Sequence, residues 1–459
     1  MPPPLTTDVA IIGAGTAGLT AFHEVTRTGK SALLIDHGPL GSTCARVGCM
    51  PSKAALHAGQ RWATLRELLN GAKAPAGTVS PDDLWREARA TRDMLAAGAA
   101  QRTVTAAGDR LLMGTARFVD RRTLDVDGRR VNARAFIVAT GSRPVVPAAI
   151  TALGGRLLTT DTLFDLEELP RRIGIMGLGV IGLEMGLALA RLGVRVVAGD
   201  LKATLAGIAD PEVDARAIQR FGSELTMWLG RPVEALADGE SIVLRSGNEA
   251  ENVDMVLAAL GRRPNLEALD LVQAGIPSDA HGRPALDPYT LRAGTSCVFL
   301  AGDVAADRPL LHEAADEGLI AARGALQMLD GNAGMPPARH VPLSIVFSDP
   351  DIASVGESFD RLDMTRTVIG TAQGSGNGRS RILGAEGNLV RVYADRVDGT
   401  LRGASLIAIH GEHLAHLLAW AIQRGETVNG LLAVPYYHPS IEEMLQSALK
   451  DAARQISGG

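Results

Sequence analysis

The sequence predicts an α/β fold in which two similar strand–turn–helix units precede a smaller α+β domain. Three observations support this prediction. A β-branched apolar run, a glycine-rich turn and a helical pattern follow one another near residue 10, the same succession recurs near residue 175, and the composition changes from about residue 337. Repeated units of this kind are typical of domains built around parallel sheets.

Composition and charge exclude several function classes. The 459 residues suffice for roughly three domains, and 46% hydrophobic with 21% charged residues is typical of a globular protein. A net charge of −5 argues against nucleic acid or an anionic membrane as a partner, and no apolar run reaches the roughly 18 residues that span a bilayer. We expect a cytoplasmic protein, because no signal-peptide pattern is present and three cysteines cannot form a secreted disulfide framework.

The first unit has the spacing of a dinucleotide-binding turn. Val9–Ile12 predicts a buried strand, and a helical pattern follows the turn. Gly13, Gly15 and Gly18 stand at G-x-G-x-x-G spacing, which lets the backbone approach a pyrophosphate at the start of the helix. Asp36 ends the next apolar run, where its carboxylate can accept a hydrogen bond from a ribose hydroxyl.

The second unit repeats this pattern. Ile173–Met176 predicts a strand, and Gly177, Gly179 and Gly182 repeat the glycine spacing. A further strand ends at Asp200, and an acid there favours the free ribose of NAD over the phosphorylated ribose of NADP. The sequence therefore predicts two Rossmann-like domains with two dinucleotide sites.

Other strand ends help to divide the chain. Apolar runs stop at Thr140 and Gly141, at Gly261, and at Gly302 before Asp303. Ligands of parallel sheets bind at such strand ends. We predict a first domain over 1–148, a second over 149–267, a return to the first over 268–336, and a carboxy-terminal α+β domain over 337–459.

The stretch Gly41–Lys53, GSTCARVGCMPSK, holds two of the three cysteines. A closely spaced pair in such a chain is more often redox-active or metal-binding than structural. Zinc would need ligands beyond Cys44, Cys49 and Cys297, so it would have to recruit histidines. Cys297 lies in an apolar run and is interpreted as a small buried side chain, and we predict no metal site.

Several blocks of the sequence, in this order, resemble a known family. They are GAGTAG, STCARVGCMPSK, ATGSRP, GLGVIGLEMG, GRRPN, AGDVAADRPLLHEAADEG, FSDPDIASVG and YYHPSIEE. The pattern is similar to the flavoprotein disulfide reductases, the class I pyridine nucleotide-disulfide oxidoreductase family that includes dihydrolipoamide dehydrogenases. Pro-Ser-Lys after the second cysteine resembles the dihydrolipoamide dehydrogenases, whereas glutathione reductases usually have Pro-Lys-Lys there.

The resemblance implies one tightly bound FAD per chain at the first glycine turn and NAD at the second. The FAD contacts it implies are Gly13, Gly15, Gly18, Asp36, Lys53, Ala116, Thr140, Gly141, Asp303 and Leu311. The NAD contacts it implies are Gly177, Gly179, Gly182, Glu184, Asp200 and Gly261.

The resemblance also implies roles for the thiols. Cys44 would exchange with substrate, and Cys49 would face the flavin. Lys53 would lie near the flavin and pair with Glu184. A helix that begins at this pair would favour a thiolate through its dipole.

Thiol–disulfide exchange needs an acid–base partner, and His438 in YYHPSIEE is the candidate. In the family the matching histidine comes from the other subunit of a homodimer. Glu443 occupies the family position of the carboxylate that orients the ring, whereas Ser440 and Glu442 are departures, so Glu442 leaves the choice of orienting carboxylate open.

The implied activity is oxidation of a protein-bound dihydrolipoyl group by NAD⁺, through a Cys44–Cys49 disulfide and FAD, with a lipoyl-carrying protein as partner. Two alternatives remain open: an NAD(P)H-dependent reductase of low-molecular-weight disulfides, similar to glutathione reductase, and a flavin-containing non-catalytic subunit of a redox complex. Arg46 replaces the family's usual asparagine, and we hypothesise that it lowers a thiolate pKa.

Overall fold

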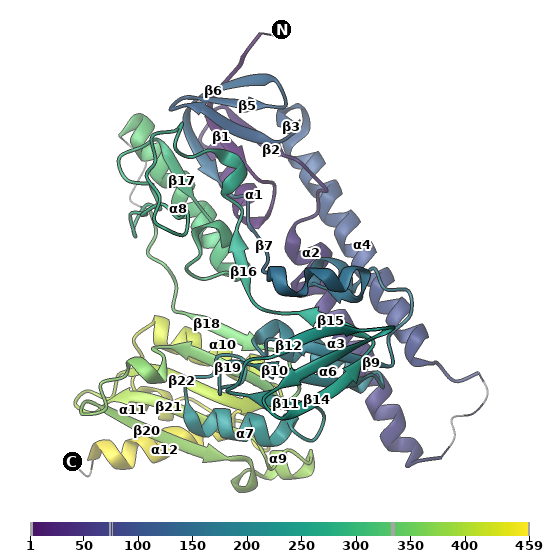
Figure 1. Ribbon diagram of the computed structural model, residues 1–459. Helices are drawn as coiled ribbons and strands as arrows, with labels where there is room; N and C mark the ends of the chain where they lie inside the picture. Colours follow the sequence, from purple (N-terminus) through teal and green to yellow (C-terminus); the bar gives the residue numbers. More distant parts are fainter. Residues whose placement is uncertain (1–2, 73–74, 76, 332–335, 458–459) are drawn as a thin grey trace.

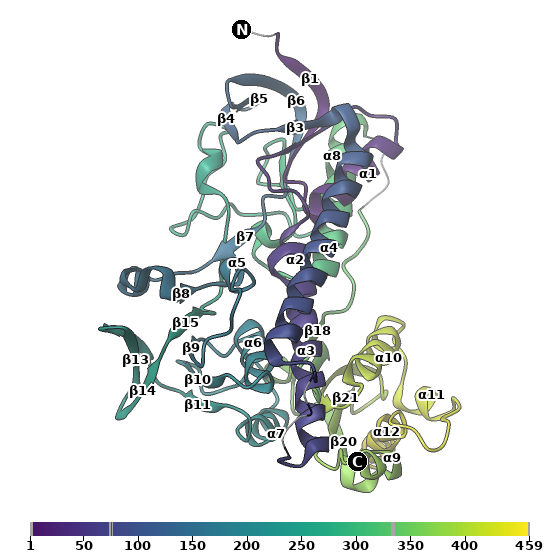
Figure 2. The same cartoon turned by 90° about the vertical axis from the view of Figure 1, so that its right-hand side faces the viewer.

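The computed structural model describes residues 3–72, 75, 77–331 and 336–457, and it confirms the predicted α/β class with a carboxy-terminal α+β domain. Figure 1 shows the first domain at the top, the second at the lower right and the carboxy-terminal domain at the lower left. Two long helices, α3 (Cys49–Leu69) and α4 (Pro81–Ala107), leave the first domain. Figure 2 shows that they descend between the other two domains.

The first sheet has a parallel centre, with strand order β3-β2-β1-β6-β5-β4 and with β17 beside β6. Ile11 of β1 lies between Leu34 and Ile137 of the neighbouring strands, and all three side chains are fully buried. The further elements of this domain are β1 (Leu5–Ile12), α1 (Thr16–Arg27), β2 (Ala32–Asp36), α2 (Thr43–Val47), β3 (Leu111–Met113), β4 (Ala116–Asp120), β5 (Thr123–Val126), β6 (Arg129–Val138), β7 (Ser142–Pro144), β17 (Val298–Leu300) and α8 (Leu311–Asp330).

The second domain is built on the parallel sheet β11-β10-β9-β15-β8, with an antiparallel three-stranded sheet, β12-β13-β14, beside it. A two-stranded antiparallel ladder between β7 and β16 connects it to the first domain. Its elements are β8 (Leu157–Leu158), α5 (Thr160–Leu163), β9 (Arg172–Met176), α6 (Val180–Arg191), β10 (Arg195–Asp200), α7 (Pro211–Phe221), β11 (Thr226–Leu229), β12 (Glu234–Asp238), β13 (Ser241–Ser246), β14 (Glu249–Val253), β15 (Met255–Ala258) and β16 (Arg262–Pro264).

The carboxy-terminal domain has an antiparallel sheet of order β18-β19-β22-β21-β20. Helices α10 and α12 pack on it, and they share one apolar core with the strands. Its elements are β18 (Leu343–Val346), β19 (Asp351–Gly356), β20 (Thr367–Gln373), α9 (Gly378–Ile382), β21 (Leu389–Asp395), β22 (Leu401–Ala408), α10 (Gly411–Gln423), α11 (Val428–Leu432) and α12 (Glu443–Ser457).

Two contacts fix how the domains meet. Gly59 of α3 packs on α6 so closely that an added Cβ would lie 2.8 Å from the carbonyl oxygen of Ala188, so this position needs glycine. Asp210, fully buried at the start of α7, accepts hydrogen bonds from Arg391 Nε at 2.7 Å and from the Tyr393 hydroxyl at 2.6 Å on β21. A buried charge that is paired in this way favours one orientation of the two domains.

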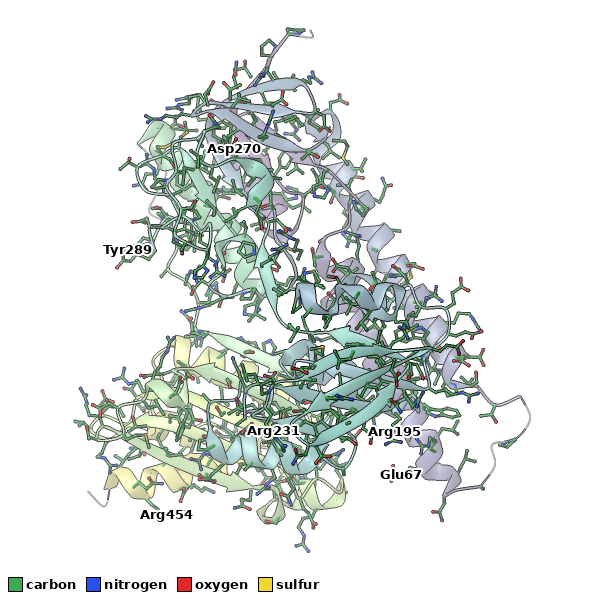
Figure 3. All side chains as sticks on the ribbon, in the orientation of Figure 1. Glu67, Arg195, Arg231, Asp270, Tyr289 and Arg454 are labelled. Carbon is green, nitrogen blue, oxygen red and sulfur yellow. The ribbon has the colours of Figure 1, made fainter. Side chains whose placement is uncertain are left out.

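Glu67, Arg195 and Arg454, which Figure 3 labels, are exposed charged side chains. Within the described residues, no helix combines the length and the apolar character needed to cross a membrane.

Candidate active site

The three glycines of the first turn have two different roles. Gly13 has φ +107°, and an added Cβ would lie 2.2 Å from the carbonyl oxygen of Ala139. An added Cβ on Gly18 would lie 1.8 Å from the carbonyl oxygen of Gly13. At Gly15, the residue before α1, the same atom would meet nothing within 4 Å. Gly13 and Gly18 therefore permit close packing, whereas Gly15 leaves room for a ligand at the helix N-terminus.

The second glycine turn has the same geometry. A Cβ added to Gly177 would lie 2.4 Å from the carbonyl oxygen of Ala259. A Cβ added to Gly182 would lie 1.9 Å from the carbonyl oxygen of Gly177. At Gly179, before α6, it would again meet nothing. Both turns thus leave space only at the middle glycine, which is where the pyrophosphate of a dinucleotide would approach.

The two acids at the strand ends brace these turns. Asp36 accepts hydrogen bonds from the backbone N–H groups of Ala14 at 2.6 Å and Gly38 at 2.6 Å. Asp200 accepts equivalent bonds from Leu178 at 2.7 Å and Lys202 at 2.8 Å. Each carboxylate still has lone pairs that could accept a hydrogen bond from a ribose hydroxyl. Binding of a ribose by either acid stays a prediction.

The two cysteines lie at a helix start. Cys44 is in the short helix α2, and Cys49 is the first residue of α3. The structure describes both as free thiols, and their disulfide stays a prediction. The position of Cys49 at the N-terminus of a 21-residue helix favours a thiolate there.

Hydrogen bonding makes the two thiols unequal. The pKa of Cys49 is lowered to about 7, chiefly because the Cys44 S–H donates a hydrogen bond to it and also because the Lys53 ammonium is near. The same hydrogen bond, together with burial, raises the pKa of Cys44. In the reduced pair Cys49 is therefore the more acidic thiol and Cys44 the less acidic one.

Arg46 does not take part in this arrangement. Its Nη1 donates to the carbonyl oxygen of Pro39 at 3.4 Å, and the cation that lowers the pKa of Cys49 is Lys53. The hypothesis that Arg46 lowers a thiolate pKa is not supported.

Lys53 forms the expected pair with Glu184. Its Nζ lies 2.9 Å from both carboxylate oxygens of Glu184, which is 3% exposed, so the bond joins α3 to α6. Phe347 completes the contact, since its ring lies 4.6 Å from Lys53 Nζ and its N–H donates to Glu184 at 3.1 Å. Phe347 is the first residue of the block FSDPDIASVG, but nothing in that block singles it out.

One cavity of about 1960 Å³ connects both glycine turns with the thiols. The expected site residues that line it are Gly15, Cys44, Cys49, Lys53, Gly141, Gly177, Gly179, Glu184, Asp200, Gly261, Asp303 and Leu311. The expected site residues that do not line it are Gly13, Gly18, Asp36, Ala116, Thr140, Gly182, His438 and Glu443. Thr140 instead donates to the carbonyl oxygen of Asn265 at 2.7 Å, and Ala116 is buried in the first sheet.

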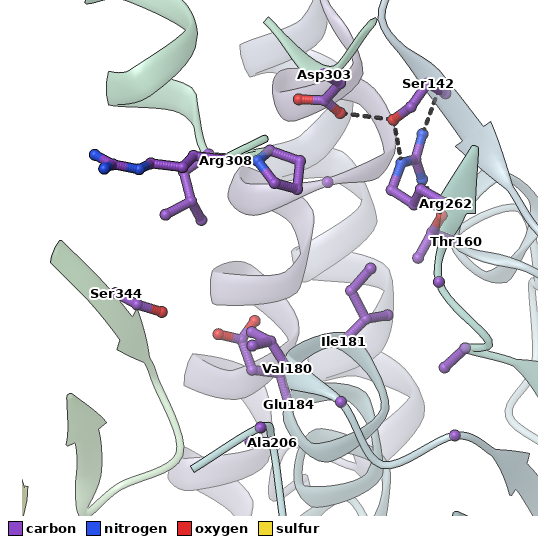
Figure 4. A pocket seen from close by; sticks show the side chains of 18 of the residues that line it. Ser142, Thr160, Val180, Ile181, Glu184, Ala206, Arg262, Asp303, Arg308 and Ser344 are labelled. Carbon is purple, nitrogen blue, oxygen red and sulfur yellow. Dashed lines mark hydrogen bonds between the residues drawn. The ribbon is translucent and has the colours of Figure 1, made fainter. Parts of the chain in front are cut away.

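Figure 4 shows a polar cluster in this cavity that the sequence did not single out. Ser142 donates to Asp303 at 2.6 Å and accepts from Arg262 Nε at 2.8 Å. Arg262 also donates to Thr160 at 3.2 Å. Ser142 and Arg262 stand in the blocks ATGSRP and GRRPN, a few residues after the ends of β6 and β15, and this position is the signal by which they could have been found.

A second unexpected pair lies at the start of α8. Arg308, labelled in Figure 4, donates to Glu313 at 3.0 Å. Glu313 is 1% exposed, and its other carboxylate oxygen has no hydrogen-bond partner among the described residues. Both residues line the cavity, so this pair adds charge to its wall.

His438 lies apart from the cysteines of its own chain. Its Nδ1 is 3.0 Å from Glu443 Oε1, and the N–H of Ser440 donates to Glu443 Oε2 at 2.9 Å. These two contacts, the Ser440 N–H first, lower the pKa of Glu443, so the carboxylate stays ionised. Glu443 rather than Glu442 is thus the carboxylate beside the ring, and the His438 side chain is 78% exposed.

Cys297 is buried, directly before β17, as expected, and its Sγ lies 3.2 Å from the carbonyl oxygen of Arg121. Among the residues that the structure describes, no group of three His, Cys, Asp or Glu side chains is arranged to hold a metal ion.

Comparison with known proteins identifies the family. The pyridine nucleotide-disulphide oxidoreductase model matches residues 7–318, and the dimerisation domain of the same family matches residues 342–449. The chain therefore belongs to the pyridine nucleotide-disulphide oxidoreductase family. Its members use FAD and NAD(P), so the chain is an FAD-dependent oxidoreductase, and the dimerisation domain supports a homodimer.

Individual relatives align with this chain over nearly its whole length. Dihydrolipoyl dehydrogenase of Thermus scotoductus is 30% identical over 98% of this chain and 98% of its own, and that of Staphylococcus aureus is 27% identical over 98% and 97%. Two solved structures share the fold. LpdA of Mycobacterium tuberculosis has a TM-score of 0.84 at 22% identity, covering 97% of this chain and 99% of its own. The HOCl-induced flavoprotein disulfide reductase RclA of Escherichia coli has a TM-score of 0.82 at 21% identity with the same coverage.

The residues present fit both cofactors. Each glycine turn leaves space at its middle glycine for a pyrophosphate, and each has a carboxylate at the next strand end. We infer that the turn around Gly15 holds FAD and the turn around Gly179 holds the pyridine nucleotide.

We predict that Gly15→Ala loses FAD while the chain still folds. The new methyl group meets no protein atom but occupies space that a pyrophosphate needs, so FAD affinity should fall at least about tenfold, or about 1.4 kcal/mol. Flavin absorbance per purified chain and the melting temperature of the apoprotein measure the two effects. Gly18→Ala is the matched control, and it should lower that melting temperature. Normal FAD content in Gly15→Ala would contradict the assignment.

We predict that Lys53→Met and Glu184→Gln shift the pKa of Cys49 in opposite directions. Lys53 lowers this pKa and Glu184 raises it. Loss of the cation should move the pKa upward from about 7 by about one unit or more, and loss of the carboxylate should move it downward. The rate of iodoacetamide alkylation of Cys49 against pH, read by peptide mass spectrometry, measures both shifts. Shifts of the same sign in both variants would count against this electrostatic arrangement.

Proposed function

We propose that the chain is a dihydrolipoyl dehydrogenase, which oxidises a protein-bound dihydrolipoyl group with NAD⁺ as acceptor. The main support is the thiol pair: Cys49, with its lowered pKa, lies beside Cys44 in a cavity that also reaches the second glycine turn. The names of relatives at 27–30% identity and the Pro-Ser-Lys sequence after Cys49 favour a dihydrolipoyl substrate.

The lowered pKa of Cys49 suits it to be the leaving thiolate. In the oxidised enzyme, a substrate thiolate attacks the sulfur of Cys44, the Cys44–Cys49 bond breaks, and Cys49 leaves as a thiolate. The second substrate thiol then attacks the substrate sulfur of the mixed disulfide, which forms the cyclic disulfide and releases Cys44. One of the two substrate protons ends on Cys44 and the other on the acid–base histidine.

When bound, FAD supplies the carrier that passes an electron pair from the dithiol to NAD⁺. The chain's own residues hold the two ends of this path together. Lys53 and Glu184 connect the helix of Cys49 with the helix that begins at the second glycine turn. Asp200 at the end of β10 is the proposed acceptor for the ribose of NAD⁺.

We further propose that His438 of the partner subunit is the acid–base group. In its own chain, His438 is exposed and does not line the cavity of the cysteines. It lies within the segment that matches the family's dimerisation domain. Glu443, which is ionised, would stabilise the ring when it takes up a proton.

The purified holoenzyme should form NADH from dihydrolipoamide and NAD⁺. Cys49→Ser should abolish this activity, whereas Cys297→Ser should retain it because Cys297 is buried away from the cavity. The same preparation is to be tested with glutathione disulfide and NADH or NADPH. Turnover only in that second assay would replace the proposal with a low-molecular-weight disulfide reductase, and turnover in neither would favour a non-catalytic subunit.

Two inactive variants should restore activity when they share a dimer. Cys49→Ser and His438→Gln should each be inactive as homodimers, but a mixed dimer holds one site with both residues intact. Random reassociation gives roughly half mixed dimers and hence roughly a quarter of wild-type activity. The recovered activity is measured as dihydrolipoamide oxidation after the two variants are denatured and refolded together. A mixture as inactive as its parents would show that the site is not shared.

A further inference from the structure

We propose that Asn377 is a positioning residue for His438, a role that rests on the proposed function. Asn377 lies between β20 and α9, 61 positions before His438 in the sequence, and is 7% exposed. Its Nδ2 donates to the carbonyl oxygen of Ser440 at 3.1 Å. A buried side-chain amide thus reaches the loop that carries the acid–base histidine.

Ser440 is held from both sides of its peptide backbone. Its carbonyl oxygen accepts from Asn377, and its N–H donates to Glu443 at 2.9 Å. Glu443 in turn lies 3.0 Å from His438 Nδ1. The chain of contacts therefore runs from Asn377 through the Ser440 backbone and Glu443 to the imidazole. A shift of Ser440 would change the position of the carboxylate and of the ring together.

The other end of Asn377 is fixed as well. Its Oδ1 accepts from the N–H of Ser380 at 2.7 Å, which caps α9. The Ser380 hydroxyl is fully buried and accepts from Asn388 at 3.2 Å, and Asn388 accepts from the N–H of Ile409 after β22 at 3.1 Å. Asn377 is thereby anchored to the sheet of the carboxy-terminal domain.

This anchoring matters because the side chain of His438 has little support of its own. It is 78% exposed, and among the described residues its side-chain polar contacts are with Glu443. An exposed ring on a loop adopts many orientations unless its neighbours are fixed. Asn377 supplies a rigid element behind that loop, so that the ring is already oriented before a partner subunit's thiols approach it.

The test uses Asn377→Ser in the full-length holoenzyme. Serine is a good N-cap and can still accept from Ser380, but its side chain is too short to reach Ser440. We expect hydrogen exchange of the peptide over residues 437–441 to accelerate. We expect the rate of dihydrolipoamide oxidation to fall at least about tenfold, because the acid–base histidine would no longer be held in position. NADH oxidation by ferricyanide, which bypasses the thiols and His438, should be unchanged.

Gln455→Ser is the matched control, since it removes a side-chain amide that donates to the carbonyl oxygen of Ile369 at 2.7 Å in the same domain and leaves the Asn377–Ser440 bond in place. Asn377→Asp, which keeps the cap and loses the donor, is the second variant if the serine variant does not fold. Unchanged exchange over 437–441, an unchanged dihydrolipoamide rate, or an equal loss in Gln455→Ser would each overturn the role of Asn377. If the wild type itself does not oxidise dihydrolipoamide, the proposed function fails, and the exchange comparison alone then decides whether Asn377 holds the loop.

Discussion

The ion pair between Lys53 and Glu184 is the contact on which the rest of the site depends. The Glu184 side chain is buried, and the Lys53 side chain is partly exposed. The pair joins the helix that begins at Cys49 to the helix that begins at the second glycine turn. The close approach of these helices at Gly59 makes the pairing possible. The same ammonium lowers the pKa of Cys49. One cation therefore joins two binding regions and, after the hydrogen bond from Cys44, helps to lower the pKa of a reactive sulfur.

The inequality of the two thiols has a second source. A single hydrogen bond lowers the pKa of Cys49 and raises that of Cys44, so Cys49 is the more acidic of the two thiols. Cys44 keeps its proton more strongly, and a base has to remove that proton before this thiol can attack a disulfide. An acid–base group from a partner subunit would complete such a site, and the proposed group is His438, whose ring lies beside Glu443.

Much of the fold could be predicted from the sequence, because strand and helix periodicity and glycine spacing are local properties. The strands before Gly13 and Gly177, the helices that follow and the change to an α+β domain all occur where these patterns predict them. The pairing of Lys53 with Glu184 came from a family resemblance rather than from local pattern. Ser142 and Phe347 contact segments distant in sequence, so their partners could not be read from local pattern, even though both residues stand in matched blocks. Arg308 contacts Glu313 only five positions along the chain, but periodicity does not show that this pair faces the cavity.

The most direct test is the visible absorbance of the Cys44→Ser holoenzyme without added reductant. A thiolate against an oxidised flavin gives a long-wavelength band beyond the flavin's own absorbance. We predict this band in Cys44→Ser, where the hydroxyl can still donate to Cys49, and its disappearance on acidification. Cys49→Ser should show no such band. A band in Cys49→Ser, with none in Cys44→Ser, would contradict the assignment of Cys49 as the thiolate beside the flavin.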